Sequence, residues 1–219
     1  MSLRINEIAP NFIAKTTHGE INLHEWLGES WGVLFSHPKD FTPVCTTELA
    51  YLTKIESEFI ARDVKLIGLS VDSVEDHNKW KEDVNSIHGK EVNYPIIGDD
   101  NLQIAKLYNM LPADEIGEAK DRTAVNNATV RSVFIIGPDK RIKLILVYPM
   151  TTGRNFDEIL RVIDSMQLTV NHKVATPANW KNGEDVIIVP AVSNEEAKSL
   201  FPKGWDEVKP YLRFVEQPT

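Results

Sequence analysis

The sequence predicts an α/β layered fold with a mainly parallel inner sheet. Short apolar runs of strand length alternate with segments in which apolar residues recur at helical spacing. The clearest runs are residues 31–36 and 64–71, and each is followed by a helical segment. Such alternation of strand and helix is typical of α/β proteins. Hydrophobic residues make up 42% of the 219 residues and charged residues 26%, which are ordinary proportions for a compact globular chain.

The first strand lies between short extended pieces and a helix. Two extended pieces, residues 11–16 and 20–23, flank a turn near the N-terminus. The strand 31–36 then runs into a loop with two prolines, after which apolar residues recur on one helix face from about residue 46 to residue 62. A strand, a loop and a helix are therefore expected around the single cysteine.

A second strand–helix unit follows directly. Strand 64–71 leads to Ser73 and Asp76, whose spacing is that of a capping box and predicts the start of a helix. A short strand at 94–97 and a short helix at 102–108 come next. This half of the chain is thus predicted to consist of βα units.

The next segment ends in a hairpin and a helix. Residues 111–129 are polar and predict a long surface loop. Apolar strands at 132–136 and 142–147 flank a Gly-Pro-Asp-Lys turn and predict a hairpin. Apolar residues on one side of 156–166 predict a closing helix. Strand–helix units followed by a hairpin and a helix are the order of a thioredoxin-like fold.

The sequence pattern changes after about residue 168. The remaining residues, 169–219, form short pieces with five prolines. About 50 residues of this composition are too few to bury a good core alone. We therefore expect a thioredoxin-like domain at 1–168 and a C-terminal extension at 169–219 that packs on the first domain or on a partner subunit and helps to form a homodimer.

Charge and hydropathy exclude several function classes. The chain has 32 Asp and Glu against 24 Lys and Arg, a formal net charge of −8, which argues against binding to nucleic acid or to anionic lipid. Its apolar runs are far shorter than the ~20 residues that span a bilayer. The N-terminus lacks a basic segment followed by an apolar stretch, so no secretory signal is visible and we expect a cytoplasmic protein.

Cys45 is the only cysteine, which excludes an internal disulfide and any multi-cysteine metal site. It lies where the helical pattern begins, and the N-terminus of a helix favours the reactive thiolate. A lone cysteine can also be a small buried packing residue. The preceding loop favours the reactive interpretation, because Pro38 and Pro43 restrict the backbone and Thr42 offers a hydroxyl three residues before the sulfur.

The loop and helix start carry a family resemblance. Residues 38–45, Pro-Lys-Asp-Phe-Thr-Pro-Val-Cys, resemble the PxxxTxxC motif of peroxiredoxins. His37 and the sequence Cys-Thr-Thr-Glu-Leu at 45–49 resemble its extended form in 1-Cys peroxiredoxins of the peroxiredoxin-6 type, within the AhpC/TSA family. The resemblance extends over nearly the whole chain, through residues 70–77, 137–140, 148–161, 174–177 and 201–204.

The resemblance implies a thiol peroxidase of antioxidant defence. Cys45 would attack the O–O bond of H2O2 or of an organic hydroperoxide and become a sulfenic acid. Arg131 matches the active-site arginine, whose guanidinium can face the sulfur and the peroxide together. Thr42 would hydrogen-bond the peroxide, and Pro38 would shield the pocket from water.

Three further residues match positions of the family. Glu48 and Arg154 match a glutamate and an arginine that orient the catalytic arginine, although charges near helix starts often only face solvent. His37 resembles a histidine that neighbours the sulfur, and as a lone loop histidine it could equally lie on the surface.

No resolving cysteine is available, so reduction of the sulfenic acid must come from outside the chain, in the simplest case from an external thiol. Glutathione, a glutathione transferase partner, thioredoxin or ascorbate would supply the reducing equivalents, the sequence does not choose among them, and no cofactor is expected. The histidines show no metal-ligand spacing, so no metal site is expected. A non-enzymatic alternative is a redox-sensing or chaperone-like thioredoxin-fold protein, which would oxidise once without cycling.

A second motif lies at residues 28–32, where Gly-Glu-Ser-Trp-Gly matches the G-x-S-x-G pattern of serine hydrolases. Some members of the resembled subfamily are described as having phospholipase A2 activity at such a serine, which would imply Ser30, His24 and Asp139 here. A nucleophile elbow places the serine after a strand, whereas Ser30 precedes one. The alternative is a simple turn, with Asp139 as a residue of the hairpin turn.

Overall fold

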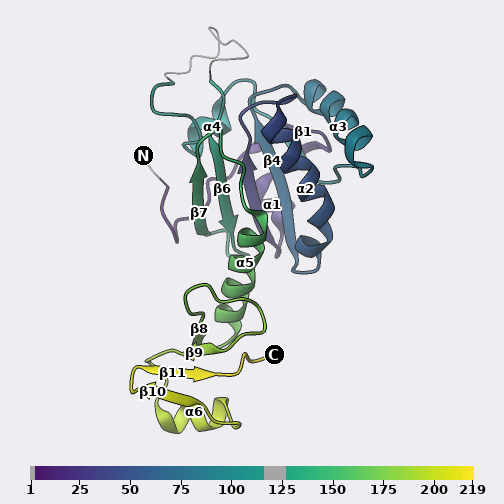
Figure 1. Cartoon of the computed structure of the whole chain (residues 1–219). Coiled ribbons are helices and arrows are strands. Elements are labelled where there is room, and N and C mark those ends of the chain that lie inside the picture. The colour runs from purple at the N-terminus through teal and green to yellow at the C-terminus, as the bar shows by residue number, and fades with distance from the viewer. Residues whose placement is uncertain (1–2, 116–126) are drawn as a thin grey trace. The chain divides into compact units, whose positions relative to one another are not determined.

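The structure, a computed structural model, describes residues 3–115 and 127–219 (Figure 1). The chain divides into two compact units, Met1–Arg154 and Asn155–Thr219. The boundary expected at residue 168 lies inside α5 (Phe156–Asn171), all of which belongs to the second unit.

The first unit is built on a sheet of seven described strands in the order β2-β1-β5-β4-β3-β6-β7. In chain order these strands are β1 (Ile13–Thr16), β2 (Gly19–Asn22), β3 (Trp31–Ser36), β4 (Val64–Ser70), β5 (Ile96–Gly98), β6 (Arg131–Ile136) and β7 (Ile142–Tyr148). Parallel pairing joins β3 to β4 and β4 to β5, while the other neighbours are antiparallel. The expected parallel sheet is therefore a three-strand centre within a mixed sheet.

The helices of the first unit explain this pairing. They are α1 (Leu23–Leu27), α2 (Pro43–Ile60), α3 (Val74–His88) and α4 (Gln103–Leu107). Parallel neighbours need a crossover, and α2 and α3 supply the crossovers from β3 to β4 and from β4 to β5. α2 contacts β4 and α3, and the two helices lie side by side in Figure 1. The order of elements expected from the sequence is confirmed.

Helix α2 begins at Pro43, three residues earlier than the apolar pattern indicated. Thr42 is the N-cap residue with an extended backbone, and Pro43 occupies the first helical position. Proline suits this position because its missing N–H would have no partner there and its φ is already helical. The earlier start puts Cys45 inside the first turn of the helix.

Helix α3 confirms the expected capping box. The Ser73 hydroxyl oxygen accepts a hydrogen bond from the Asp76 backbone N–H at 3.1 Å, and the same hydroxyl donates to the Asp76 carboxylate at 2.8 Å. The helix ends at Gly89, whose φ of 70° is left-handed and favours glycine. Both helix ends are thus specified by local sequence.

The hairpin is also confirmed, since β6 and β7 pair antiparallel from Arg131 opposite Tyr148 onward. The surface loop expected at 111–129 includes residues 116–126, which lie outside the described residues. Strands β3 and β6 are buried along their full length. Continuous burial is expected of central strands that are covered on both faces. The first residue of β6 is therefore buried as well.

The second unit has a small core of its own. It contains α5, β8 (Val174–Ala175), β9 (Val186–Ile188), α6 (Asn194–Leu200), β10 (Asp206–Lys209) and β11 (Leu212–Val215), with its strands in the order β10-β11-β9-β8. Its buried cluster comprises Val174, Trp180, Val186, Ile188, Val192, Ala197, Phe201 and Val215. This is more apolar packing than the composition of residues 169–219 predicted.

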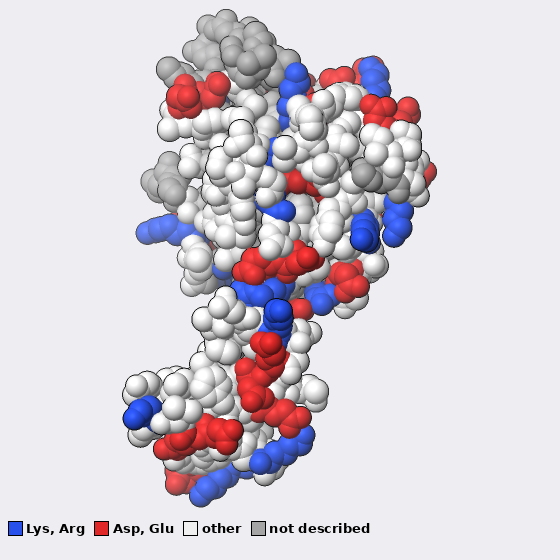
Figure 2. Space-filling model, viewed as in Figure 1, with Lys and Arg blue, Asp and Glu red and all other residues white. Residues whose placement is uncertain are grey.

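Among the described residues, no helix combines the length and the apolarity that crossing a bilayer requires. On the face displayed in Figure 2, basic and acidic residues are interspersed and no continuous basic area is visible. This mixed surface agrees with the charge balance of the sequence.

Candidate active site

Cys45 is fully buried in the first turn of α2. Its sulfur therefore lies at the end of the helix where the peptide dipoles place partial positive charge. The backbone leading to it is restrained, because Phe41 has a positive φ of 54° and Thr42 is extended. The helix start, the extended cap and the buried sulfur are therefore built by consecutive residues.

Arg131 brings a cation from a distant part of the chain to this sulfur. It is the first residue of β6, and its Nη1 lies 3.3 Å from Cys45 Sγ. Its Nε and Nη2 donate to the Met150 carbonyl at 2.9 and 2.7 Å. With its side chain 3% exposed, the guanidinium is held by its partners on several sides and faces the sulfur with Nη1.

Glu48 joins this arginine to a second one. Its Oε2 accepts from Arg131 Nη1 and from Arg154 Nη2, each at 2.7 Å. Its Oε1 accepts from the Arg154 Nε at 2.9 Å and from the Arg154 backbone N–H at 2.8 Å. Glu48 lies one helical turn after Cys45, so α2 presents the sulfur and the carboxylate together.

The electrostatics of this cluster follow from its burial. Burial alone would raise the pKa of the Glu48 carboxyl, but hydrogen bonds and charge from Arg154, with the charge of Arg131, hold that pKa below its ordinary value. The alternative that Glu48 and Arg154 only face solvent is wrong, since their side chains are 3% and 0% exposed. Two guanidinium groups and one carboxylate leave one net positive charge beside the sulfur, which a thiolate would balance.

Arg154 also locks the cluster to the sheet. Its Nη1 donates to the Ser36 carbonyl at 2.8 Å and to the Ser132 carbonyl at 3.1 Å. These carbonyls belong to β3 and β6, the neighbouring central strands. The position of Arg131 is therefore fixed, through Glu48 and Arg154, relative to the two central strands.

Thr42 and Pro38 occupy the loop between β3 and α2. The Thr42 hydroxyl donates to the Lys39 carbonyl at 2.9 Å, which leaves its oxygen as an acceptor. Thr42 is half-buried, whereas Pro38 is buried. Both residues lie within the loop that ends at Cys45.

His37 is fully buried, so the alternative that it lies on the surface is wrong. Its Nε2 lies 2.7 Å from Asp40 Oδ1, and the other carboxylate oxygen lies 2.5 Å from His77 Nδ1. Ligand atoms of these three residues lie within 4.8 Å of one another, as in a candidate metal site. Sequence spacing missed this group because His77 comes from α3, 37 positions after Asp40.

The three residues of the hydrolase motif take other partners. Ser30 donates to Asp63 at 2.7 Å, His24 Nε2 lies 2.8 Å from the Ala9 carbonyl, and Asp139 accepts from Lys143 at 2.6 Å. Ser30 immediately precedes β3, and Gly28 ends α1 with a positive φ of 56°. The local structure is thus a turn between a short helix and a strand.

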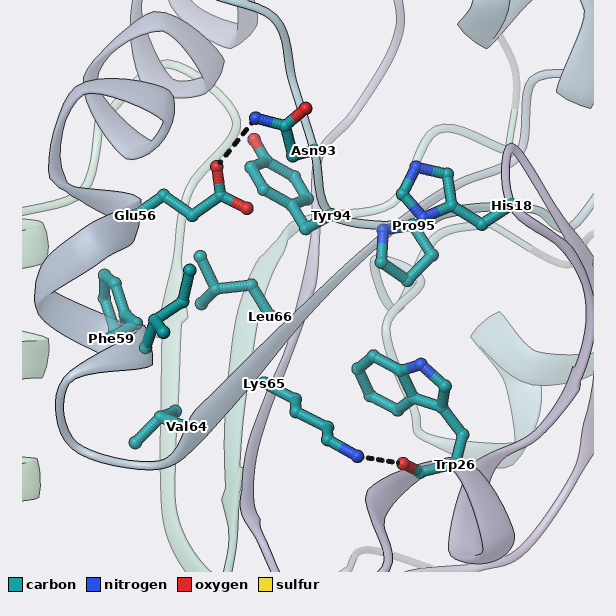
Figure 3. A pocket seen from close by; sticks show the side chains of 11 residues that line it. His18, Trp26, Glu56, Phe59, Val64, Lys65, Leu66, Asn93, Tyr94 and Pro95 are labelled. Atoms are coloured by element: carbon teal, nitrogen blue, oxygen red, sulfur yellow. Dashed lines mark hydrogen bonds between the residues drawn. The ribbon is translucent and has the colours of Figure 1, made fainter.

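A separate pocket of about 260 Å³ lies at the other end of α2 (Figure 3). Glu56, Tyr94 and Trp26 are among its lining residues, and no residue of the peroxiredoxin motif lines it. Figure 3 shows the Asn93 amide directed at Glu56 and the Lys65 ammonium directed at the Trp26 carbonyl. Burial raises the pKa of the Glu56 carboxyl, with a smaller opposing effect from Asn93. This pocket is distinct from the surroundings of Cys45.

Comparison with known proteins places the chain among relatives along its whole length. The AhpC/TSA family model matches residues 5–145, and the model of the C-terminal domain of 1-Cys peroxiredoxin matches residues 165–204. Peroxiredoxin-6 of Rattus norvegicus is 52% identical over 225 residues, which cover 99% of this chain and 98% of that protein.

Two solved structures extend the likeness to the fold. The crystal structure of a mutant of peroxiredoxin 6 from Arenicola marina has a TM-score of 0.90 and 51% identity, and the match covers 100% of both chains. A yeast mitochondrial 1-Cys peroxiredoxin, studied for thiol resolution via the glutathione/thioredoxin systems, has a TM-score of 0.90 and 55% identity. That match covers 98% of this chain and 99% of the yeast chain.

Proposed function

The chain belongs to the AhpC/TSA family as a 1-Cys peroxiredoxin, a thiol peroxidase, and from that premise we propose that Cys45 is the thiol that attacks the peroxide. The observation that carries this proposal is the 3.3 Å contact between Cys45 Sγ and Arg131 Nη1 inside a buried cluster with one excess positive charge. A thiolate is the nucleophilic form of cysteine, and this arrangement stabilises it.

The chemical step makes one bond and breaks one. The Cys45 thiolate attacks the O–H oxygen of the peroxide, which keeps its proton in the sulfenic acid. The S–O bond forms as the O–O bond breaks, and the departing alkoxide or hydroxide takes up a proton from water. Negative charge moves from sulfur onto oxygen during this step, so a fixed cation beside both atoms lowers the barrier. Arg131 is placed for this role, while Thr42 offers a hydroxyl oxygen that can accept a hydrogen bond from the peroxide.

Glu48 and Arg154 support this chemistry through Arg131. Glu48 shares one carboxylate oxygen between both guanidinium groups, and Arg154 fixes that carboxylate against strand carbonyls. We assign them the positioning of Arg131. We also propose that Pro38, which is buried in the loop that leads to Cys45, shields that side of the site from water.

An external thiol completes the cycle. The sulfenic acid condenses with a thiol to give a mixed disulfide and water, and a second thiol then releases the Cys45 thiolate and a disulfide product. The yeast relative is described with the glutathione/thioredoxin systems. We propose glutathione, with or without a glutathione transferase partner, or thioredoxin as the reductant here. No other cysteine exists in the chain to close an internal disulfide.

A cysteine-dependent fast phase tests the function. Trp80 Nε1 donates to the Thr46 hydroxyl, one residue from the sulfur, so tryptophan fluorescence should report oxidation of Cys45. In stopped-flow mixing with H2O2 we expect a second-order change in the wild type and none in Cys45→Ser. Continued turnover when glutathione or thioredoxin is added distinguishes a peroxidase from a redox sensor, which would oxidise once and stop.

We also propose a homodimer in the cytoplasm. Among the described strands β7 is an edge of the seven-stranded sheet, and Val147 on it is 61% exposed. An uncovered edge strand is a template for pairing with a second copy. Light scattering at micromolar concentration should give twice the chain mass, and a monomer would contradict the proposed homodimer.

The proposed cytoplasmic location rests on the free thiol, because a reducing compartment suits a free thiol. Cell fractionation tests the location.

A further inference from the structure

His37, Asp40 and His77 form a buried hydrogen-bonded group next to the proposed site. Their exposures are 0%, 1% and 0%. His37 and Asp40 belong to the loop between β3 and α2, and His77 belongs to α3. The His37 ring packs against the Trp80 ring with centroids 5.0 Å apart, and Trp80 donates to Thr46 beside Cys45. The group is therefore connected to the first turn of α2 through one side chain.

The hydrogen bonds of this group determine where its protons lie. His77 Nε2 is 3.0 Å from the Ile97 carbonyl, which can only accept, so Nε2 carries a proton. Burial alone would raise the pKa of the Asp40 carboxyl, but hydrogen bonds from His37 and His77 lower that pKa overall. An ionised carboxylate also only accepts, so His77 Nδ1 at 2.5 Å carries a proton as well. His77 is then an imidazolium paired with Asp40.

The same carboxylate determines the tautomer of His37. Its Nε2 lies 2.7 Å from Asp40 Oδ1 and must donate. Its Nδ1 is buried and has no hydrogen-bond partner among the described residues. A second proton there would place a second cation beside His77, whose ring centroid is 5.9 Å away, and would leave a buried N–H unpaired. His37 Nδ1 is therefore a bare lone pair.

The distances favour a shared proton over a metal ion. A nitrogen and an oxygen that both ligate a tetrahedral Zn²⁺ at about 2.0–2.1 Å stand roughly 3.3 Å apart. The two N···O distances in this group are 2.5 and 2.7 Å, which are hydrogen-bond lengths. The three side chains are thus joined by hydrogen bonds.

We propose that Asp40 and His77 are positioning residues that hold His37 as the Nε2–H tautomer, so that its Nδ1 accepts a hydrogen bond from one O–H of bound H2O2, while the other O–H is free for Thr42. This inference rests on the proposed peroxidase function and extends it to two residues outside the cysteine–arginine cluster. Asp40 is itself fixed, because its backbone N–H donates to the Asp72 carboxylate at 2.9 Å. An acceptor of fixed tautomer orients the peroxide for attack by the sulfur.

The tautomers are measured directly in the resting protein. In long-range ¹H–¹⁵N spectra of reduced, ¹⁵N-histidine-labelled wild type at neutral pH, we expect His37 to be protonated at Nε2 alone and His77 at both nitrogens. His37→Gln and His77→Gln assign the two signals by removing them. A His37 proton on Nδ1, or a neutral His77, would overturn the inference whether or not any variant is active.

Asp40→Asn is the informative variant. An amide donates through nitrogen and accepts through oxygen, so the introduced side chain can donate to His77 Nδ1 and still accept from His37 Nε2. We expect His77 to lose its second proton, while His37 keeps its tautomer but loses the anion that strengthened Nδ1 as an acceptor. The second-order reaction with H2O2 should slow about tenfold, as expected for a weakened transition-state hydrogen bond.

The matched control is Asp83→Asn, which removes an exposed carboxylate from the same helix α3 and should change neither the spectra nor the rate. A fast cysteine-dependent phase in the wild type together with an unchanged rate in Asp40→Asn overturns this inference and leaves the proposed function standing. Absence of that phase in the wild type overturns both.

Discussion

Cys45 and Ser30 are both candidate nucleophiles in short motifs, and their surroundings differ in how many partners converge. Around Cys45, a guanidinium, a shared carboxylate and a second guanidinium form a buried network tied to two strands. Ser30 makes a single described side-chain hydrogen bond, to Asp63 at 2.7 Å. A motif shows which residue types are near in sequence, but reactivity depends on groups that the fold brings from elsewhere.

Removal of the cation that faces the sulfur should have the largest effect on the reactivity of Cys45. Arg131→Gln should lower the second-order rate with H2O2 by about 10²–10³-fold, because a preorganised charge at the developing anion is lost. Stopped-flow fluorescence measures the rate. Arg131→Lys keeps the charge but loses the planar fork, so an intermediate rate is expected. A rate equal to wild type in both variants would show that the contact with Cys45 Sγ is not catalytic.

Glu48→Gln tests whether the buried charge balance also stabilises the fold. Removing one partner of a buried ion pair costs about 3–5 kcal/mol of unfolding free energy, which urea denaturation measures. Because the folded-state pKa of Glu48 is lowered, its stabilisation is present above the unfolded value and is lost as pH falls through the folded value. The difference in unfolding free energy between wild type and Glu48→Gln should therefore narrow below about pH 4.3. A difference that grows at acid pH would contradict this account.

Thr42→Val tests the role of the Thr42 hydroxyl in binding the peroxide. The hydroxyl donates to the Lys39 carbonyl, so its loss removes one hydrogen bond that holds the loop and one acceptor for the peroxide. We expect the rate to fall about tenfold with the cysteine still reactive toward a small thiol reagent. Thr42→Ser is the matched control, because it keeps the hydroxyl and should retain most of the rate.

Ser30→Ala should have the smallest effect. The hydroxyl makes one hydrogen bond outside the core, so stability should change by about 1 kcal/mol or less, and the peroxide rate should stay within about twofold. The phospholipase A2 hypothesis at Ser30, His24 and Asp139 remains a prediction that the same variant tests. A lipase activity of the wild type that disappears in Ser30→Ala would establish a second nucleophile.

Local sequence predicted most of the elements, because their signals are local. Hydrophobic periodicity located the strands and helices, and Ser73 with Asp76 located the start of α3. Pro43 at the first helical position explains why α2 begins earlier than its apolar pattern. The core of the second unit was underestimated, because Val174, Val186 and Val215 become buried only when short strands pair across the unit.

By itself, the sequence determined the single thiol, its place at a helix start and the family that the surrounding motifs resemble. Only the tertiary structure decided that Glu48 lies between two arginines and that His77 meets Asp40, which are long-range contacts. Residue spacing along a helix or strand is set by local geometry, whereas contacts between elements depend on sheet order and packing. The charges and proton positions around Cys45 therefore depend on the tertiary structure, because the groups that determine them come from several different elements.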